Sequence, residues 1–262
     1  MSEIRRFTDG MDALEAYLDC RCTRFEPMLD DDPITQAFQE AQQRGAREGF
    51  VPVLITPNDT LWETLVMNSD PDSGSEEGYA FCPERVTDYR REFLGQALPE
   101  GSELLEQSIR LRREEADEDG LDWENGIVGV LEEGEGNDRF LGYWNYATSH
   151  TDPLLLAEIP VEHPWQVFAW LPFGGWNECP GTGELMVVSA HWFRQHRAVP
   201  AVVTHDVLEY ALPQPVAEDA ALELAVEQYA FCPDIIDQAE DLTLGRLAGE
   251  LACSRSWYFW WD

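Results

Sequence analysis

The hydrophobic positions of the chain follow two rhythms, one typical of helices and one typical of strands. A helix is predicted from Asp32, with Pro33 at its first position and Gly49 at its end. Its buried face is expected to carry Ile34, Phe38, Ala41 and Gly45. The apolar run 50–56 that follows predicts a buried strand.

Three further segments are predicted as extended. Residues 60–67 alternate Leu61, Glu63, Leu65 and Met67 with four other side chains, which predicts a strand antiparallel to 50–56. Residues 126–131 and 139–146 predict a hairpin across an acidic turn. Residues 165–173 are a strand candidate.

The second half of the chain predicts the element order β-α-β-β-α-(α)-β. Its strands are expected at 154–160, 199–204, 208–212 and 257–261, and its helices begin near Thr182, Ala217 and Pro233. This order suits a split βαβ or ferredoxin-like sheet with helices on one face.

One hexapeptide occurs twice, as 79–84 and 229–234, with five of six residues identical: Tyr-Ala-Phe-Cys-Pro followed by an acid. The pattern predicts an internal duplication and an α+β fold (an α/β sandwich) of two related βαββαβ-like units, whose mixed or antiparallel sheets are covered by helices. The expected domains are 1–98, a diverged repeat; 99–153, an acidic helix-plus-hairpin connector; and 154–262, the better-preserved copy.

Charge is the most unusual bulk property of the chain. It carries 51 acidic residues against 17 basic ones, a net charge of -34, and all the basic residues are arginine. Such a surface repels nucleic-acid phosphate and anionic lipid and attracts a cationic protein. Adaptation to salt explains the same composition equally well. The N-terminus lacks a signal-like apolar run, which predicts a cytoplasmic protein with reduced cysteines.

Four separated motifs carry a resemblance to a known family. They are the segments 172–180 (PFGGWNECP), 203–206 (VTHD), 227–234 (EQYAFCPD) and 257–262 (WYFWWD). In this order they resemble the bacterial family called domain of unknown function 4253, over about residues 154–262. The family brings no established chemistry. Some of its relatives lie near toxin systems, so the resemblance implies an immunity role.

Catalytic chemistry has one candidate constellation. Cys179, His205 and Asp206 are the residue types of a thiol hydrolase, in which a histidine base activates a cysteine at a helix start. The first half of the chain has Pro57 where His205 would lie. Cys232 is expected to fill the core as a small apolar side chain. No metal site and no cofactor are predicted.

The leading hypothesis is a non-enzymatic acidic binding protein that neutralises a cationic toxin, with a basic protein as its partner and with neither nucleic acid nor membrane. The alternative is a thiol-dependent hydrolase that uses Cys179 and His205. The candidate binding residues are Trp176, Asn177, Glu178, His205, Asp206, Glu114, Glu115, Glu132 and Glu133.

Overall fold

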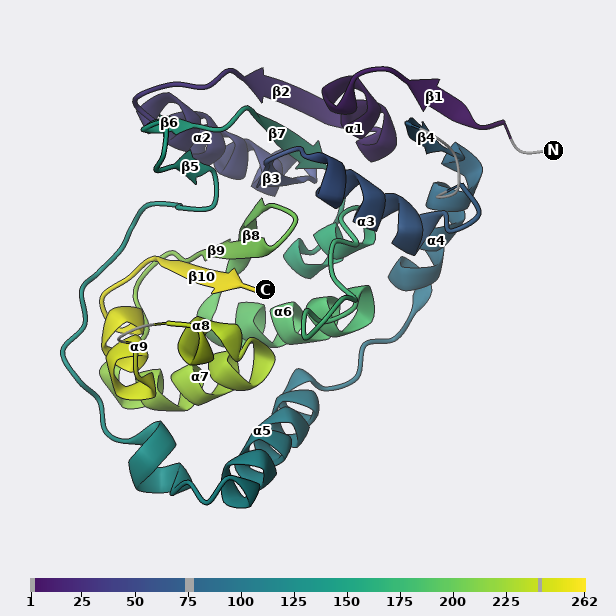
Figure 1. Ribbon diagram of the computed structural model, residues 1–262. Helices are drawn as coiled ribbons and strands as arrows, with labels where there is room; N and C mark the ends of the chain where they lie inside the picture. The colour runs from purple at the N-terminus through teal and green to yellow at the C-terminus, as the bar shows by residue number, and fades with distance from the viewer. Residues whose placement is uncertain (1–2, 74–77, 240–241) are drawn as a thin grey trace.

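A mixed sheet of six strands forms the centre of the molecule in the computed structural model, which describes residues 3–73, 78–239 and 242–262 (Figure 1). The strand order is β10 (Ser256–Trp260), β9 (Val207–Ala211), β8 (Val199–Val203), β3 (Val51–Ile55), β7 (Leu154–Ile159) and β2 (Arg21–Phe25). Only β3 and β8 pair in parallel; each other neighbouring pair is antiparallel. Strands from both ends of the chain therefore share one sheet.

Each face of the sheet buries its own set of side chains because successive strand residues point to opposite faces. One face carries Leu54 and Val202 and packs on Phe38 of α2 (Asp32–Glu48). The other carries Val53 and Val203 and belongs to the larger core. That core includes residues of α6 (Thr182–His196), α7 (Glu218–Phe231) and α9 (Leu244–Leu251).

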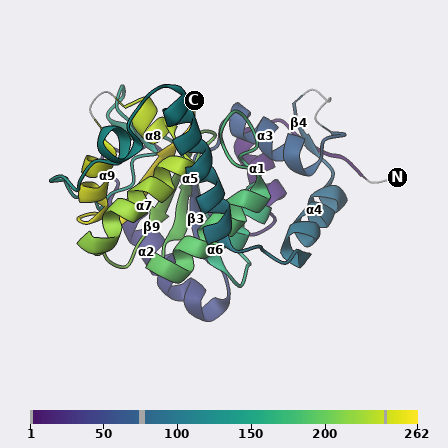
Figure 2. The same ribbon diagram turned by 90° about the horizontal axis from the view of Figure 1, so that it is seen from below.

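The remaining elements extend this layered body. Beside the sheet lie α1 (Gly10–Leu18), α3 (Asp59–Ser69), α4 (Pro83–Gly95), η2 (Pro164–Ala169) and the strand pair β1 (Arg5–Phe7) with β4 (Tyr79–Phe81). Smaller elements are η1 (Trp123–Val128), the pair β5 (Trp144–Asn145) with β6 (His150–Thr151), and α8 (Asp234–Asp237). The helix α5 (Gly101–Glu118) lies outside α6 and α7 and forms an extra layer (Figure 2).

Much of the expected pattern is confirmed. Ile34, Phe38, Ala41 and Gly45 are all buried in α2, although Asp31 rather than Asp32 occupies the N-cap position, without a side-chain hydrogen bond to the first turn. All five residues of β3 are buried. The second half has its predicted order of elements, from β7 to β10. No helix in the described residues is long and apolar enough to cross a membrane.

The predicted strand at 60–67 is wrong, because the segment is the helix α3. Its start is fixed by Asn58, whose side chain accepts a hydrogen bond from the backbone N–H of Leu61 at 2.7 Å. The buried apolar residues are Leu61, Trp62, Leu65 and Val66. They form two pairs spaced by four residues, a spacing that fits a helix as well as the alternation fits a strand.

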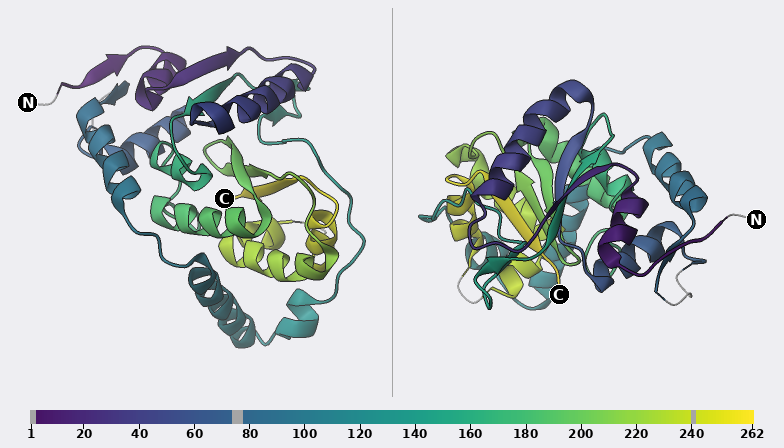
Figure 3. Two further views of the ribbon diagram at one scale, coloured as in Figure 1. Left: turned by 180° about the vertical axis from the view of Figure 1, so that it is seen from behind. Right: turned by 90° about the horizontal axis from the view of Figure 1, so that it is seen from above.

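The predicted hairpin at 126–146 and the strand at 165–173 are also wrong. Residues 123–128 form η1, whose first turn is capped by the Asp122 side chain through the backbone N–H of Asn125 at 3.0 Å. The chain then runs on along α9 instead of folding back (Figure 3). Residues 164–169 form the short helix η2, where Pro164 fits the first turn and the side chain of Gln166 accepts from the His163 N–H.

The repeated pentapeptide has two structures. Tyr79–Phe81 is the strand β4, which pairs with β1, whereas Tyr229–Phe231 is the last turn of α7. In both copies the proline lies at the start of a helix, and both Cys82 and Cys232 are fully buried. The expectation that Cys232 fills the core is confirmed. Both copies of the pentapeptide therefore lead into a helix, but the preceding residues form a strand in the first copy and the end of a helix in the second.

Candidate functional site

Three strands end at one edge of the sheet and bring polar side chains together there. β3 and β8 are parallel, and β10 runs the same way as β8 because both are antiparallel to β9. The residues beyond their ends include Asn58, His205, Asp206 and Asp262. In open sheets, ligands bind outside the carboxyl ends of such strands.

His205 and Asp206 lie together at this edge, with Asn58 beside them. Nδ1 of His205 is 3.0 Å from Nδ2 of Asn58 and 3.1 Å from Oδ1 of Asp206. Asp206 is fixed from two other sides: Thr204 donates its hydroxyl to Oδ1 at 2.8 Å, and the Trp260 indole donates to Oδ2 at 3.2 Å. Asn58 reaches His205 only because β3 lies next to β8, and the sequence analysis did not predict this pairing.

The glycine-rich loop, residues 174–181 before α6, joins this edge through Asn177. Asn177 has a left-handed backbone, and its side-chain amide donates to the Asp262 carbonyl at 2.6 Å. The backbone N–H of Asp262 in turn donates to Asp234 at 3.0 Å. Trp176 is half-buried and donates its indole N–H to the carbonyl of Phe173 at 2.8 Å. The predicted loop residues therefore hold the C-terminal strand in place.

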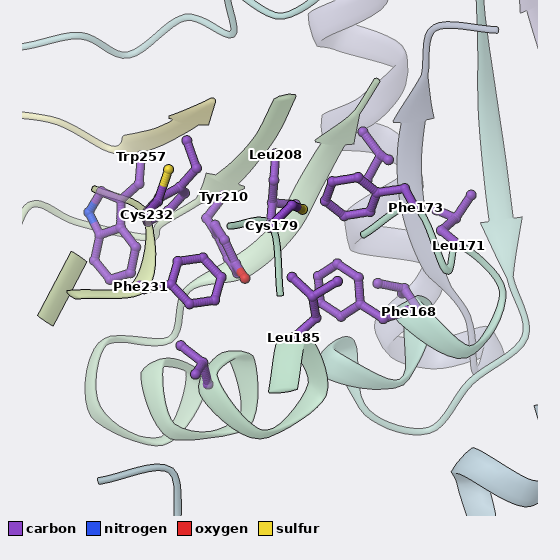
Figure 4. Packing of buried hydrophobic residues seen from close by; sticks show 14 of the residues in the cluster. Phe168, Leu171, Phe173, Cys179, Leu185, Leu208, Tyr210, Phe231, Cys232 and Trp257 are labelled. Atoms are coloured by element: carbon purple, nitrogen blue, oxygen red, sulfur yellow. The ribbon is translucent and has the colours of Figure 1, made fainter. Parts of the chain in front are cut away.

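Cys179 lies in the apolar core, among Phe173, Leu185 and Leu208 (Figure 4). Its side chain is 3% exposed, and burial, followed by the nearby Cys232, raises the pKa of its thiol far above the usual range. Burial likewise raises the pKa of Cys232, to about 12, and the thiol of Cys232 donates to the Trp260 carbonyl at 3.0 Å. Among the described residues, the polar contacts of His205 are with Asn58 and Asp206, and none is with Cys179.

Glu178 and Glu115 come from separate parts of the chain and meet at Arg112 of α5. Arg112 donates to Glu115 at 2.9 Å and also hydrogen-bonds to Glu178. These contacts tie the glycine-rich loop to the outer helix. Beside them lies a cavity of about 310 Å³ whose wall includes Asn177, Cys179 and Phe231.

A continuous acidic segment follows from α5. Residues 114–138, named the acidic strap here, contain eleven acidic residues and no basic one, and all eleven are exposed. Arginines outside the strap neutralise three of them: Glu115, Glu124 and Asp138. The strap passes from α5 through η1 and runs along α9 (Figure 3).

Backbone contacts fasten the strap to α9. The N–H of Glu132 donates to the carbonyl of Gly245 at 3.0 Å, and its side chain accepts from the Thr243 hydroxyl at 2.9 Å. A methyl group added at Gly249 would overlap the carbonyl oxygen of Glu132. Glu133 follows directly and is exposed. The strap is thus held by its backbone and by the Glu132 side chain, while its acidic residues remain exposed.

One group of three carboxylates has the spacing of a cation site. Asp30, Asp31 and Asp32 can each bring an oxygen within 4.8 Å of the others. Asp31 is already engaged, because Arg139 donates to Oδ1 at 3.0 Å and the Tyr143 hydroxyl donates to Oδ2 at 3.3 Å. These bonds tie residues 139–143 to the first turn of α2.

Residues 155–262 match the sequence profile of the family described as "Domain of unknown function (DUF4253)". The matched part includes His205, Asp206 and the glycine-rich loop, together with β8, β9, β10 and nearly all of β7. It does not include β3, Asn58 or the acidic strap. Comparisons with curated proteins and with solved structures gave no match.

Proposed function

We propose that the chain is a non-enzymatic binding protein that holds a cationic protein partner on the acidic strap. The observation that carries this proposal is the strap itself: eleven exposed acidic residues in 25 positions without a basic residue. A surface of one sign attracts an oppositely charged partner and raises its rate of association.

The geometry of the strap supports this use of the charge. Glu114, Asp117, Glu118, Asp119, Glu133 and Glu135 form no ion pair with any residue that the structure describes. Their carboxylates are therefore available to an external cation. The contacts with Gly245 and Gly249 keep the middle of the strap against α9, which lowers the conformational entropy that a partner must remove on binding.

A matched pair of variants tests the proposal. The strap variant E114Q/E118Q/E133Q/E135Q and the control variant E26Q/E63Q/E92Q/E162Q each remove four exposed carboxylates, none of which forms an ion pair with a described residue. The probe is a labelled decaarginine peptide, titrated by fluorescence anisotropy at low and at high salt. We expect the strap variant to bind more weakly than the control. Equal weakening, or affinity unchanged in molar salt, contradicts the proposal.

The biological role proposed for this binding is immunity: the chain occludes a basic bacterial toxin in the cytoplasm. The family resemblance supports this role beside the charge. A growth assay tests it: a candidate basic toxin is expressed together with the wild type, the strap variant or the control variant. Rescue by the control but not by the strap variant is expected. Rescue by all three proteins would show that protection does not depend on the charges of the strap.

An internal duplication is proposed as the origin of the fold. The pairs α2–β3 and α6–β8 have the same order, and β3 and β8 lie side by side with Leu54 opposite Val202. The repeated pentapeptide supports the same view. Residues 59–69 and 207–211 differ, since one is helix and the other strand. Sequences of relatives that match over both halves would test it.

A further inference from the structure

A small cavity at the end of β3 has an unusual lining. It measures about 210 Å³ and lies between the first turns of α1 and α3, next to Asn58. Its wall combines two carboxylates with two aromatic rings: Asp9, Asp59, Trp62 and Tyr79. No lysine, arginine or histidine is among its lining residues.

The two carboxylates are not neutralised by a cation. Neither Asp9 nor Asp59 forms an ion pair with any residue in the described ranges. Both act on the same phenol: the Tyr79 hydroxyl donates to Asp59, and that bond, burial and then the charges of Asp59 and Asp9 raise the pKa of Tyr79. Two carboxylates without a cationic partner among the described residues therefore line a small cavity.

The N-termini of α1 and α3, which lie at this cavity, do not turn it into an anion site. A free helix N-terminus attracts anions through its unpaired N–H groups. Here Asp9 already accepts from the N–H groups of Met11 at 2.9 Å and Asp12 at 3.1 Å, and Asn58 accepts from Leu61. An anion would meet occupied N–H groups and two carboxylates, whereas a cation would meet only the carboxylates.

The aromatic side of the cavity favours an organic cation over a metal ion. The rings of Trp62 and Tyr79 stand at 77° to each other with centroids 5.6 Å apart. The Tyr79 ring lies against the backbone at Gly10, where an added methyl group would be 3.0 Å from the ring. Perpendicular aromatic walls beside carboxylates suit a guanidinium or an ammonium group, which gains from both the ring faces and the negative charge.

We propose that this cavity binds the guanidinium or ammonium head group of an organic cation, held between the Asp9 and Asp59 carboxylates and the rings of Trp62 and Tyr79. The site goes beyond the acidic strap and does not depend on it. The head group is carried either by a free small molecule or by an arginine or lysine side chain of a protein. Asn58 connects the cavity to His205, at the edge of the part that matches the family.

The test compares a charged probe with its neutral isostere. Binding of N-acetyl-arginine methylamide and of N-acetyl-citrulline methylamide is followed by NMR shifts of the Trp62 indole and nearby amides. We expect the arginine probe to bind and the citrulline probe to bind about fivefold more weakly, the upper end of the range for one exposed ion pair. Equal binding of the two probes overturns the proposal, as does no binding of either.

Three variants locate the site without unfolding it. D9N keeps the cap of α1, because asparagine caps as well as aspartate does, and D59N keeps the shape of the residue. Each should weaken the arginine probe by about fivefold, while E63Q on the outer side of α3 should leave it unchanged. Arginine-probe binding that persists in D9N/D59N overturns the assignment. The strap variant E114Q/E118Q/E133Q/E135Q should bind the arginine probe as tightly as the wild type does. Failure of the cavity proposal can therefore be distinguished from failure of the strap proposal.

A further titration with a peptide shows whether the cation belongs to a protein side chain or to a free small molecule. The capped tripeptide Ala-Arg-Ala carries the same head group on a polypeptide backbone. If it binds as well as the arginine probe and loses affinity in D59N, the cavity accepts a protein side chain. If only the single residue binds, the occupant is a free small cation. Binding of Ala-Arg-Ala that is indifferent to D59N contradicts the site.

Discussion

Glu209 accepts a hydrogen bond from the backbone N–H of Gly142 at 2.9 Å, deep between the sheet and the chain that follows the acidic strap. Its other oxygen accepts from the N–H of Leu141 at 2.8 Å. The side chain of Glu209 is fully buried, and no cation pairs with it in the described residues. Within the part of the chain that the structure describes, the hydrogen bonds to this carboxylate come from two backbone N–H groups alone. Protonation of Glu209 should therefore change how firmly residues 141–142 are held, which makes their attachment depend on pH.

The first prediction concerns the dependence of stability on pH. Burial raises the pKa of Glu209 from 4.5 to about 7, against the smaller opposing effect of the two N–H groups. The folded protein therefore holds this proton more tightly than the unfolded chain does. The contribution of Glu209 to the free energy of unfolding should fall by about 3 kcal/mol as pH rises from 4.5 to 7, and stay constant above that.

Urea unfolding of the wild type and E209Q across this range measures the effect as the difference between the two proteins. Other carboxylates titrate in both and cancel. Amide shifts of Leu141 and Gly142 in the wild type should titrate with a midpoint near 7, which does not require the variant to fold. If the difference in the free energy of unfolding between the two proteins does not change with pH, and the amide shifts do not titrate, Glu209 stays in one protonation state.

The second prediction concerns the contact between the strap and α9. Gly249→Ala would place a methyl group on the Glu132 carbonyl, and the backbone on both sides must move. We expect a loss of about 1–3 kcal/mol, as for other overpacked sites, and faster proteolysis within 129–138. Gly95→Ala is the matched control, because nothing lies within 4 Å of its added methyl group. If G249A is as stable and as resistant as G95A, the strap is not held there.

The third prediction concerns Arg112. Replacing it with glutamine removes the charge that joins Glu115 to Glu178, so the glycine-rich loop should loosen from α5. Since Arg112 is only partly exposed, we expect a loss of about 1 kcal/mol at low salt and less at 1 M salt. Arg110→Gln is the control, as Arg110 is exposed on the same helix and forms no ion pair with any residue that the structure describes. Thermal unfolding at both salt concentrations compares the two variants.

The fourth prediction concerns the thiols. Cys253 is exposed, whereas Cys179 and Cys232 are buried with raised pKa values. Iodoacetamide at pH 8 should label Cys253 within minutes and leave the other two intact until the protein is denatured. Mass spectrometry of peptides reads out each site. Rapid labelling of Cys179 in the native protein, slowed in His205→Ala, would instead favour the thiol-hydrolase alternative.

Some elements were predictable because a single pattern determined them. The segment 32–48 has one apolar face in helical phase, a proline at its start and a glycine after it, and these signals agree. The run 51–55 is apolar throughout and became a buried central strand. Residues 60–67 carried two compatible periods, and the packing of Trp62 and Val66 decided between them.

The site was predictable only in part, for a physical reason. His205 and Asp206 are adjacent in sequence, so their proximity needed no fold. Asn58 lies 147 positions away and reaches His205 only because β3 pairs with β8. Nothing local in the sequence reports such a pairing. The cavity beside Asn58 depends in the same way on how α1, α3 and β4 come together.

The position of β3 between β7 and β8 also governs how the chain can be made. During synthesis β3 emerges early, and neither neighbour exists until residues 154–159 and then 199–203 have left the ribosome. Both edges of an entirely apolar strand stay open until residue 159 has emerged, and one of them stays open until residue 203. Translation speed through residues 56–203 and chaperone supply should therefore affect the yield of native protein more than they would for a chain whose neighbouring strands are consecutive.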